Sequence, residues 1–141
     1  MKAKSINGDT IASFTSALDK SMADGYKPSL AFVFLTELND IDEVSAIMDA
    51  KGISIFGAST SDKFTDQGME PTGIVALLLD INPAYFRVEF KDFSADSVYG
   101  SSLQVGKSAK SLFDHPAFII SVADINLAGE EIIRGLLDAA G

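Results

Sequence analysis

The sequence contains no cysteine and a single histidine, His115. The absence of cysteine excludes disulfide bonds, thiolate nucleophiles and thiolate zinc sites, and it fits a reducing compartment, so we expect a cytoplasmic protein. Basic residues are also few, because 11 Lys and Arg stand against 20 Asp and Glu and give a formal net charge of −9. An acidic surface repels nucleic-acid phosphates and anionic lipids, so we expect neither nucleic acid nor a membrane as a partner.

Long hydrophobic runs are absent as well. Apolar stretches such as Ile74 to Leu79 are far shorter than the roughly 20 residues of a membrane-spanning helix. Met1 to Lys4 is followed by polar residues rather than by an apolar core, so we predict no targeting segment. A chain of 141 residues with 47% apolar composition is an ordinary size for one globular domain, and we expect residues 1–141 to form a single domain.

The first half of the chain alternates between strand and helix patterns. Ile11, Phe14 and Leu18 recur at helical spacing, behind Asp9 as a candidate cap and ahead of Gly25 as a left-handed stop. The stretch 29–36 is continuously apolar, which is typical of a central strand covered on both faces. The predicted elements are a strand at 4–6, a helix at 10–23, a strand at 29–36, a helix from Asn39 or Asp40 to just before Gly52, and a buried strand at 53–56.

The second half predicts a polar surface loop over 62–71 and then a buried strand over 73–80. Alternating residues over 85–93 predict an antiparallel strand that forms a hairpin with it. The remaining predicted elements are a helix from Asp96 or Ser97 that ends at His115-Pro116 and approaches the sheet at Gly106, a strand at 117–122, and a helix at 129–140. The fold class is therefore α/β, a layered mixed sheet with flanking helices in the order βαβαβ, β-hairpin, αβα.

The end of the strand at 53–56 is the predicted ligand site, because open α/β sheets bind ligands at the carboxyl ends of their strands. Backbone amides and hydroxyls there suit a carboxylate, and Asp62 or Asp124 could accept from the ammonium of an amino acid. We expect Gly57→Val to abolish binding, with less effect on stability if Gly57 does not require positive φ. Alternatively, the hydroxyl of Ser59 only satisfies nearby amides. The candidate ligand-binding residues are Gly57, Ala58, Ser59, Thr60, Ser61, Asp62, Tyr85, Asp124 and Asn126.

Two chemical alternatives involve the same stretch. Ser59 and His115 stand in the order of an α/β-hydrolase triad, but the nucleophile elbow needs glycine at the position of Ser61 and a helix directly after it. We therefore predict no enzyme and keep a hydrolase that uses Ser59 as the alternative, with His115 capping a helix end. The acids Asp62, Asp66 and Glu70 do not have the spacing of a known cation loop, so we predict neither metal nor cofactor.

Three stretches resemble the FIST N-terminal domain: Ile53 to Thr60, Gly73 to Phe86, and Ala117 to Ser121 together with Gly129 to Gly135. The resemblance covers nearly the whole chain. It implies a bacterial intracellular sensory module of signal transduction that binds a small ligand such as an amino acid and works beside a signalling output domain or protein. It implies no catalytic residues.

The chain departs from the family pattern in two places. Gly57 to Ser61 match the strand-end motif of the family, but Asp62 and Lys63 do not match the Gly and acid that follow, which leaves the charge preference of the ligand open. A further strand and a second FIST domain normally come after Gly141, so the resemblance implies an excised or naturally short copy. A missing partner would leave an apolar stripe uncovered, so we expect a homodimer through the helix at 129–140. A purely oligomerising module is the other alternative.

Overall fold

The computed structural model describes residues 1–65, 68–70, 72–92, 97–122 and 129–141. It divides into two compact units, residues 1–88 and residues 89–141. Within the described ranges, no helix is long and apolar enough to cross a bilayer.

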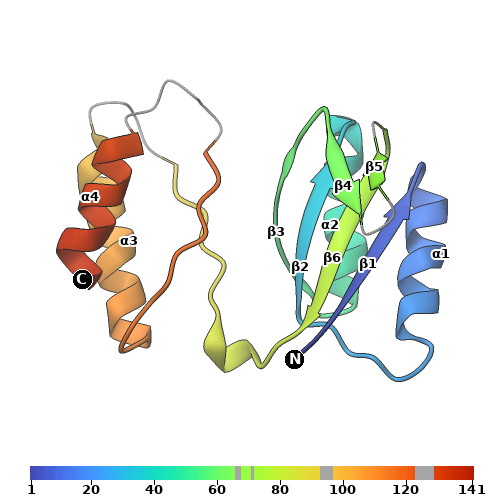
Figure 1. The fold of residues 1–141 in the computed structure, drawn as a ribbon, viewed down its shortest axis with the longest axis horizontal. Helices are drawn as coiled ribbons and strands as arrows, with labels where there is room; N and C mark the ends of the chain where they lie inside the picture. Colours follow the sequence, from blue (N-terminus) through green and yellow to red (C-terminus); the bar gives the residue numbers. More distant parts are fainter. Residues whose placement is uncertain (66–67, 71, 93–96, 123–128) are drawn as a thin grey trace. The chain divides into compact units, whose positions relative to one another are not determined.

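The first unit is built on a mixed sheet in the order β1-β6-β2-β3 (Figure 1). β2 pairs parallel with β3, whereas β6 is antiparallel to both β1 and β2. The described elements of this unit are β1 (Lys2–Gly8), α1 (Ile11–Met22), β2 (Leu30–Leu35), a 3-10 helix at Leu38–Asp40, α2 (Ile41–Ala50), β3 (Ser54–Ser59), β4 (Lys63–Thr65), β5 (Gly68–Glu70), β6 (Ile74–Asp80) and a 3-10 helix at Pro83–Tyr85. The predicted α/β class, a mixed sheet with flanking helices, is confirmed.

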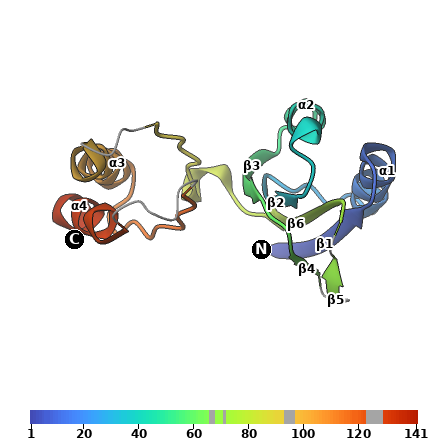
Figure 2. The same ribbon diagram turned by 90° about the horizontal axis from the view of Figure 1, so that it is seen from above.

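Both helices of this unit lie on the same face of the sheet, as Figure 2 shows from above. Alternate strand residues point to this face and form the core with the inner sides of the helices. The core includes Phe14 and Leu18 of α1, Val44 and Met48 of α2, Ala31, Val33 and Leu35 of β2, and Ile74, Ala76 and Leu78 of β6. The intervening residues of β2, Phe32 and Phe34, are only half-buried. The predicted central position of β2 in the sheet is confirmed. Within the first unit, however, the helices cover one face of β2 and not both faces as predicted.

The predicted hairpin between 73–80 and 85–93 is not formed. Residues 86–92 have no regular structure, and Tyr85 ends the 3-10 helix. The physical reason is that β1 and β2 already occupy both edges of β6, so a further strand has no free edge of β6 to pair with. Apolar and charged residues do alternate in this segment, but the strand predicted to pair with it, β6, is already paired on both edges.

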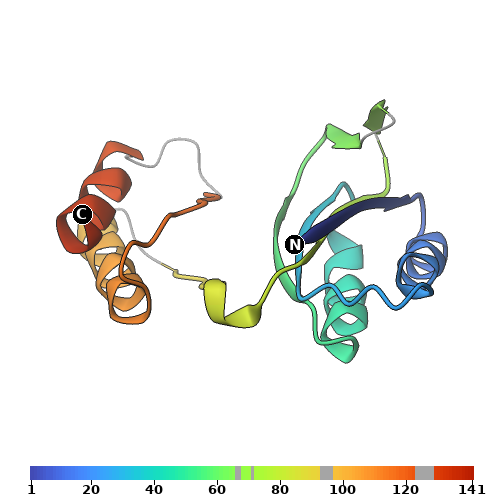
Figure 3. The same ribbon diagram turned by 60° about the horizontal axis from the view of Figure 1, so that its bottom comes forward.

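The predicted loop over 62–71 was also wrong, because β4 and β5 pair there as an antiparallel ribbon. The chain runs from the end of β3 into this ribbon, which Figure 3 shows beyond the sheet. β3 itself is an edge strand, and its residues from Gly57 to Ser59 are exposed. The prediction of a buried strand at 53–56 was therefore wrong about its burial. Ile53, just ahead of β3, is buried, but Ile55 and Phe56 are only half-buried because β3 lies at the edge of the sheet.

The helix ends predicted for α1 and α2 largely agree with the structure. The predicted helix at 10–23 is confirmed as α1, but its cap is Thr10 rather than Asp9. The Thr10 hydroxyl accepts from the backbone N–H of Ser13, and the Ser13 hydroxyl accepts from the N–H of Thr10, which satisfies two free donors of the first turn. Gly25 and Gly52 both have positive φ, 85° and 69°, and end the two helices as predicted.

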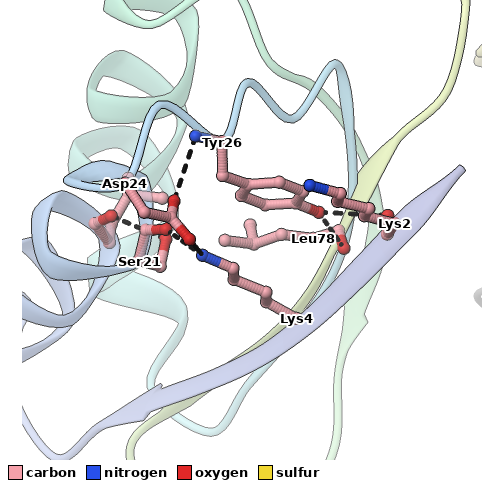
Figure 4. Close-up of polar contacts among 7 residues, drawn as sticks. Lys2, Lys4, Ser21, Asp24, Tyr26 and Leu78 are labelled. Carbon is pink, nitrogen blue, oxygen red and sulfur yellow. Dashed lines mark hydrogen bonds and ion pairs between the residues drawn. The ribbon is translucent and has the colours of Figure 1, made fainter.

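Tyr26 ties the segment after α1 to the sheet (Figure 4). Its buried hydroxyl donates to the backbone carbonyl of Leu78 at 2.7 Å, and the carbonyl of Lys2 lies 3.2 Å away. Burial raises the pKa of the phenol, because the anion would lose its hydration. One side chain therefore joins the loop before β2 to β1 and β6.

Lys4 stabilises the same corner from β1. Its ammonium donates to the carbonyl of Ser21 at 2.5 Å and to the carboxylate of Asp24 at 2.9 Å, and it lies 4.6 Å from the centre of the Tyr26 ring (Figure 4). The hydrogen bond from Lys4 lowers the pKa of Asp24. The backbone N–H of Tyr26 donates to the same carboxylate at 3.1 Å. The ion pair between Lys4 and Asp24, together with the contact of Lys4 with the Tyr26 ring, therefore holds β1 against the segment after α1.

The second unit consists of α3 (Val98–Leu112) and α4 (Gly129–Ala140), and its described part contains no strand. Gly106 approaches α4 rather than a sheet, since a Cβ there would lie 2.7 Å from the Cβ of Ala139. Gly135 of α4 is equally close to α3, at 2.7 Å from the carbonyl oxygen of Tyr99. Residues 117–122 form no strand although they are apolar, because the described part of this unit offers no partner for their backbone groups.

Candidate functional site

The site predicted from the strand end lies where β2 and β3 finish side by side. Their parallel register places Leu35 opposite Ser59, and the N–H of Thr60 donates to the carbonyl of Leu35 at 2.9 Å. The carboxyl ends of the two strands therefore form one edge of the sheet. The beginning of α2 reaches the same edge because only a short 3-10 helix separates β2 from it.

A recess of about 120 Å³ opens between α2 and β3 at this edge, and we call it the α2–β3 recess. Its lining is mostly aliphatic, and its polar side chains are two serines, one on each element. The lining residues are Val33 and Leu35 of β2, Ile41, Val44 and Ser45 of α2, and Ile55, Gly57, Ala58 and Ser59 of β3. Three of the predicted ligand residues, Gly57, Ala58 and Ser59, are thus brought together around one cavity.

The hydroxyl groups at this strand end differ in what they contact. Thr60 donates to the backbone carbonyl of Asp62 at 3.0 Å, and Ser61 donates to the carboxylate of Asp62 at 3.3 Å. Among the described residues, by contrast, the side chains of Ser45 and Ser59 have no hydrogen-bond partner. Thr60 and Ser61 therefore stabilise their own turn, whereas the two serines of the recess keep their donors and acceptors for water or a ligand.

Gly57 is required by the sheet itself. A Cβ at this position would lie 1.8 Å from the carbonyl oxygen of Val33, the residue paired with it on β2. Such a contact is impossible without moving the edge strand. The expectation that Gly57→Val mainly removes ligand binding is therefore wrong, because this substitution displaces β3 first.

Comparisons with protein-family models, with curated proteins and with solved structures find no match. The resemblance to the FIST N-terminal domain stays a prediction from the sequence. What the site can do has to follow from its geometry.

The remaining predicted ligand residues are not gathered at the recess. Asp62 is exposed and does not line it. Tyr85 follows β6, which is antiparallel to β2 and β3, so β6 ends at the opposite edge of the sheet beside Leu30. The Tyr85 side chain is 74% exposed there. The residues Asp124 and Asn126 lie outside the described residues.

The sequence did not point to the residues that α2 contributes, Ile41 and Ser45. Their helical spacing was visible, but which strand α2 packs against depends on the sheet order. It also did not point to Lys63, which is only 2% exposed and donates to the hydroxyl of Thr36 at the end of β2. Lys63 lies in β4, within the stretch that was predicted to be a polar loop.

The alternative chemistries find little support in the described residues. The element after Ser59 and its turn is β4 rather than the helix that a nucleophile elbow requires. Within the described part of the chain, no cluster of three or more His, Asp or Glu side chains could hold a metal ion. Asp66 lies outside the described residues. The described lining of the recess contains no carboxylate, histidine or lysine that could act as a general acid or base.

Proposed function

We propose that this protein is a non-catalytic sensory module that binds a small metabolite in the α2–β3 recess. The observation that carries the proposal is the coincidence of a cavity with two free hydroxyls, Ser45 and Ser59, at the carboxyl edge of a parallel strand pair. A small ligand placed there contacts one helix and two strands. Its binding can therefore change how α2 packs on the edge strand.

Ser59 provides the sharpest test, since its hydroxyl has no structural partner in the described residues. A library of small metabolites is screened with backbone amide NMR, and binding is expected to shift the amides of 57–59. Ser59→Ala is then expected to weaken affinity by about 1–3 kcal/mol when it leaves a ligand group unpaired. The matched control is Ser61→Ala, which removes a hydroxyl that bonds only to its neighbour Asp62. Equal effects of both variants, or hits that shift only residues elsewhere, contradict the proposal.

The signalling role is supported by the FIST resemblance rather than by the cavity. It places the module in the bacterial cytoplasm, beside an output domain or protein that reads the bound state. Sequencing the encoding gene beyond Gly141 tests this part. An output domain in the same reading frame, or a signalling gene next to it, is the expected result, and neighbours without any signalling function count against it.

Self-association through α4 is the second candidate, because α4 has an apolar stripe on its outer side. Ile132 and Leu136 are buried against α3, but Ile133 and Leu137 are 56% and 62% exposed. A two-fold dimer that joins α4 to α4 covers this stripe on both copies with one self-complementary contact. Sedimentation at rising concentration is expected to show a dimer that Leu137→Lys abolishes. A protein that stays monomeric at every concentration contradicts self-association through α4 and leaves the ligand proposal unaffected.

A further inference from the structure

The size of the α2–β3 recess limits which part of a ligand it can enclose. An apolar cavity of about 150 Å³ holds one benzene molecule. The recess, at about 120 Å³, is somewhat smaller and therefore encloses a body of about four to five carbon atoms. This matches a branched four-carbon body such as an isobutyl group, with the rest of the ligand at the mouth.

The lining determines the polarity of the enclosed part. Val33, Leu35 and Ile55 form an aliphatic floor, and Ser45 and Ser59 add hydroxyls without charge. None of the described residues that line the recess is charged. Since an unpaired charge loses much of its hydration on entering such a cavity, charged ligand groups are excluded from its interior. The two hydroxyls can each donate to and accept from a neutral polar group.

The charges that flank Ile41 at the start of α2 all have the same sign. Glu37 and Asp40 precede it, and Asp42 and Glu43 follow it, with Asp42 and Glu43 in the first turn of the helix. Acids at this position offset the positive end of the helix dipole, which would otherwise attract an anion. These four carboxylates therefore repel a ligand carboxylate at the mouth. Lys63 lies at the same edge, but it is only 2% exposed, donates to the hydroxyl of Thr36 and does not line the recess. The chain as a whole adds to this repulsion with its net charge of −9.

We infer that the recess selects a short branched aliphatic molecule whose single polar end is uncharged, an alcohol or a carbonyl compound, over a free carboxylate or an amino-acid zwitterion. The inference rests on the proposed function and narrows it. The branched body occupies the aliphatic floor, and the neutral end exchanges hydrogen bonds with Ser45 and Ser59. An amino acid meets the same floor but brings a carboxylate to an acidic edge.

Four compounds that share the isobutyl group and differ in their polar group test the inference: isoamyl alcohol, isovalerate, isoamylamine and leucine. Titrations of the full chain are followed by amide and methyl NMR at low ionic strength and again with added salt. Isoamyl alcohol is expected to bind at least about tenfold more tightly than isovalerate and leucine, whose carboxylates meet the acidic edge. The ammonium of isoamylamine is attracted by that edge, and added salt is expected to weaken its binding. Added salt is expected to strengthen isovalerate binding, because it screens the acidic edge, and to leave the alcohol unchanged.

Ser45→Leu fills the recess from α2 and is expected to abolish binding of the alcohol. Ser16→Leu makes the same change at an exposed position of α1 that does not line the recess, and it should bind like the parent. A carboxylate-bearing member that binds as tightly as the alcohol, but still loses binding in Ser45→Leu, overturns the ligand class and leaves the proposed function standing. Binding that survives in Ser45→Leu, or no binding by any member, overturns the inference, and survival in a folded variant overturns the assignment of the recess as well.

Discussion

Replacing Gly57 by alanine tests whether the sheet, rather than a ligand, requires glycine at this position. An ideal Cβ would lie 1.8 Å from the carbonyl oxygen of Val33, whereas ordinary contact begins at 3.4 Å. The edge strand β3 therefore has to move by about 3.4 − 1.8 = 1.6 Å. The hydrogen bond from Thr60 N to Leu35 O, now 2.9 Å long, closes the same strand end and would break.

The cost follows from these two losses. Overpacking costs about 1–3 kcal/mol, and a lost hydrogen bond costs about 0.5–1.5 kcal/mol, so Gly57→Ala should lower the free energy of unfolding by about 1.5–4.5 kcal/mol. Urea denaturation should show a lower midpoint at an unchanged slope. Ser54→Ala, on the exposed side of the same strand, is the control and should stay within about 0.5 kcal/mol of the parent. A stability of Gly57→Ala equal to that of the control would refute the close approach of β3 to β2.

Two further predictions concern the corner of Tyr26. Tyr26→Phe should destabilise the protein by about 1–3 kcal/mol in urea denaturation, because the carbonyl of Leu78 loses a buried donor, whereas Tyr85→Phe at an exposed site should change little. Since the pKa of Tyr26 is raised in the folded state, the advantage of the parent should be present below its ordinary pKa of 10.0 and fall as the pH rises above it; an advantage that is constant into strong alkali contradicts this. Because the hydrogen bond from Lys4 lowers the pKa of Asp24, the parent should exceed Asp24→Asn in stability above the ordinary pKa of 3.8 and lose that difference as the pH falls below it. Thermal unfolding across acid pH checks this, and a difference that persists in strong acid shows that the charge is not responsible.

The sequence predicted the elements of the first unit better than their neighbours. The strand β6 was predicted correctly because a short apolar run bounded by Gly73 and Asn82 is typical of a buried strand. Its partners were missed, since nothing local in 73–80 states that the amino-terminal strand, more than 60 residues earlier, lies beside it. Once β1 and β2 occupy both edges, the alternating residues after Tyr85 have no place in the sheet. Pairing over long distances is a property of the whole chain, whereas periodicity is local.

The site shows the same division. Gly57, Ala58 and Ser59 were predicted because small residues end an apolar strand, and they line the recess. Ser45 was missed because a serine on a helix carries no local sign of the strand that it faces. Tyr85 was placed at the site because the direction of β6 was unknown, and an antiparallel strand delivers its end to the opposite edge.

The pairing of β1 with β6 has a consequence for the order of events during synthesis. Gly8 pairs with Ile74, so 74 − 8 = 66 residues have to follow β1 before its first partner on β6 leaves the peptidyl-transferase centre. At about 5–20 residues per second this takes roughly 3–13 s. During that time β2, α2 and β3 can already form their parallel unit, because their contacts are close in the chain. The amino-terminal strand joins last, and the bond between Tyr26 and Leu78 closes in the same step. A nascent chain that stalls between β3 and β6 therefore presents β2 with one open edge and β1 with no partner, the state in which a chaperone that binds extended apolar segments has most to protect.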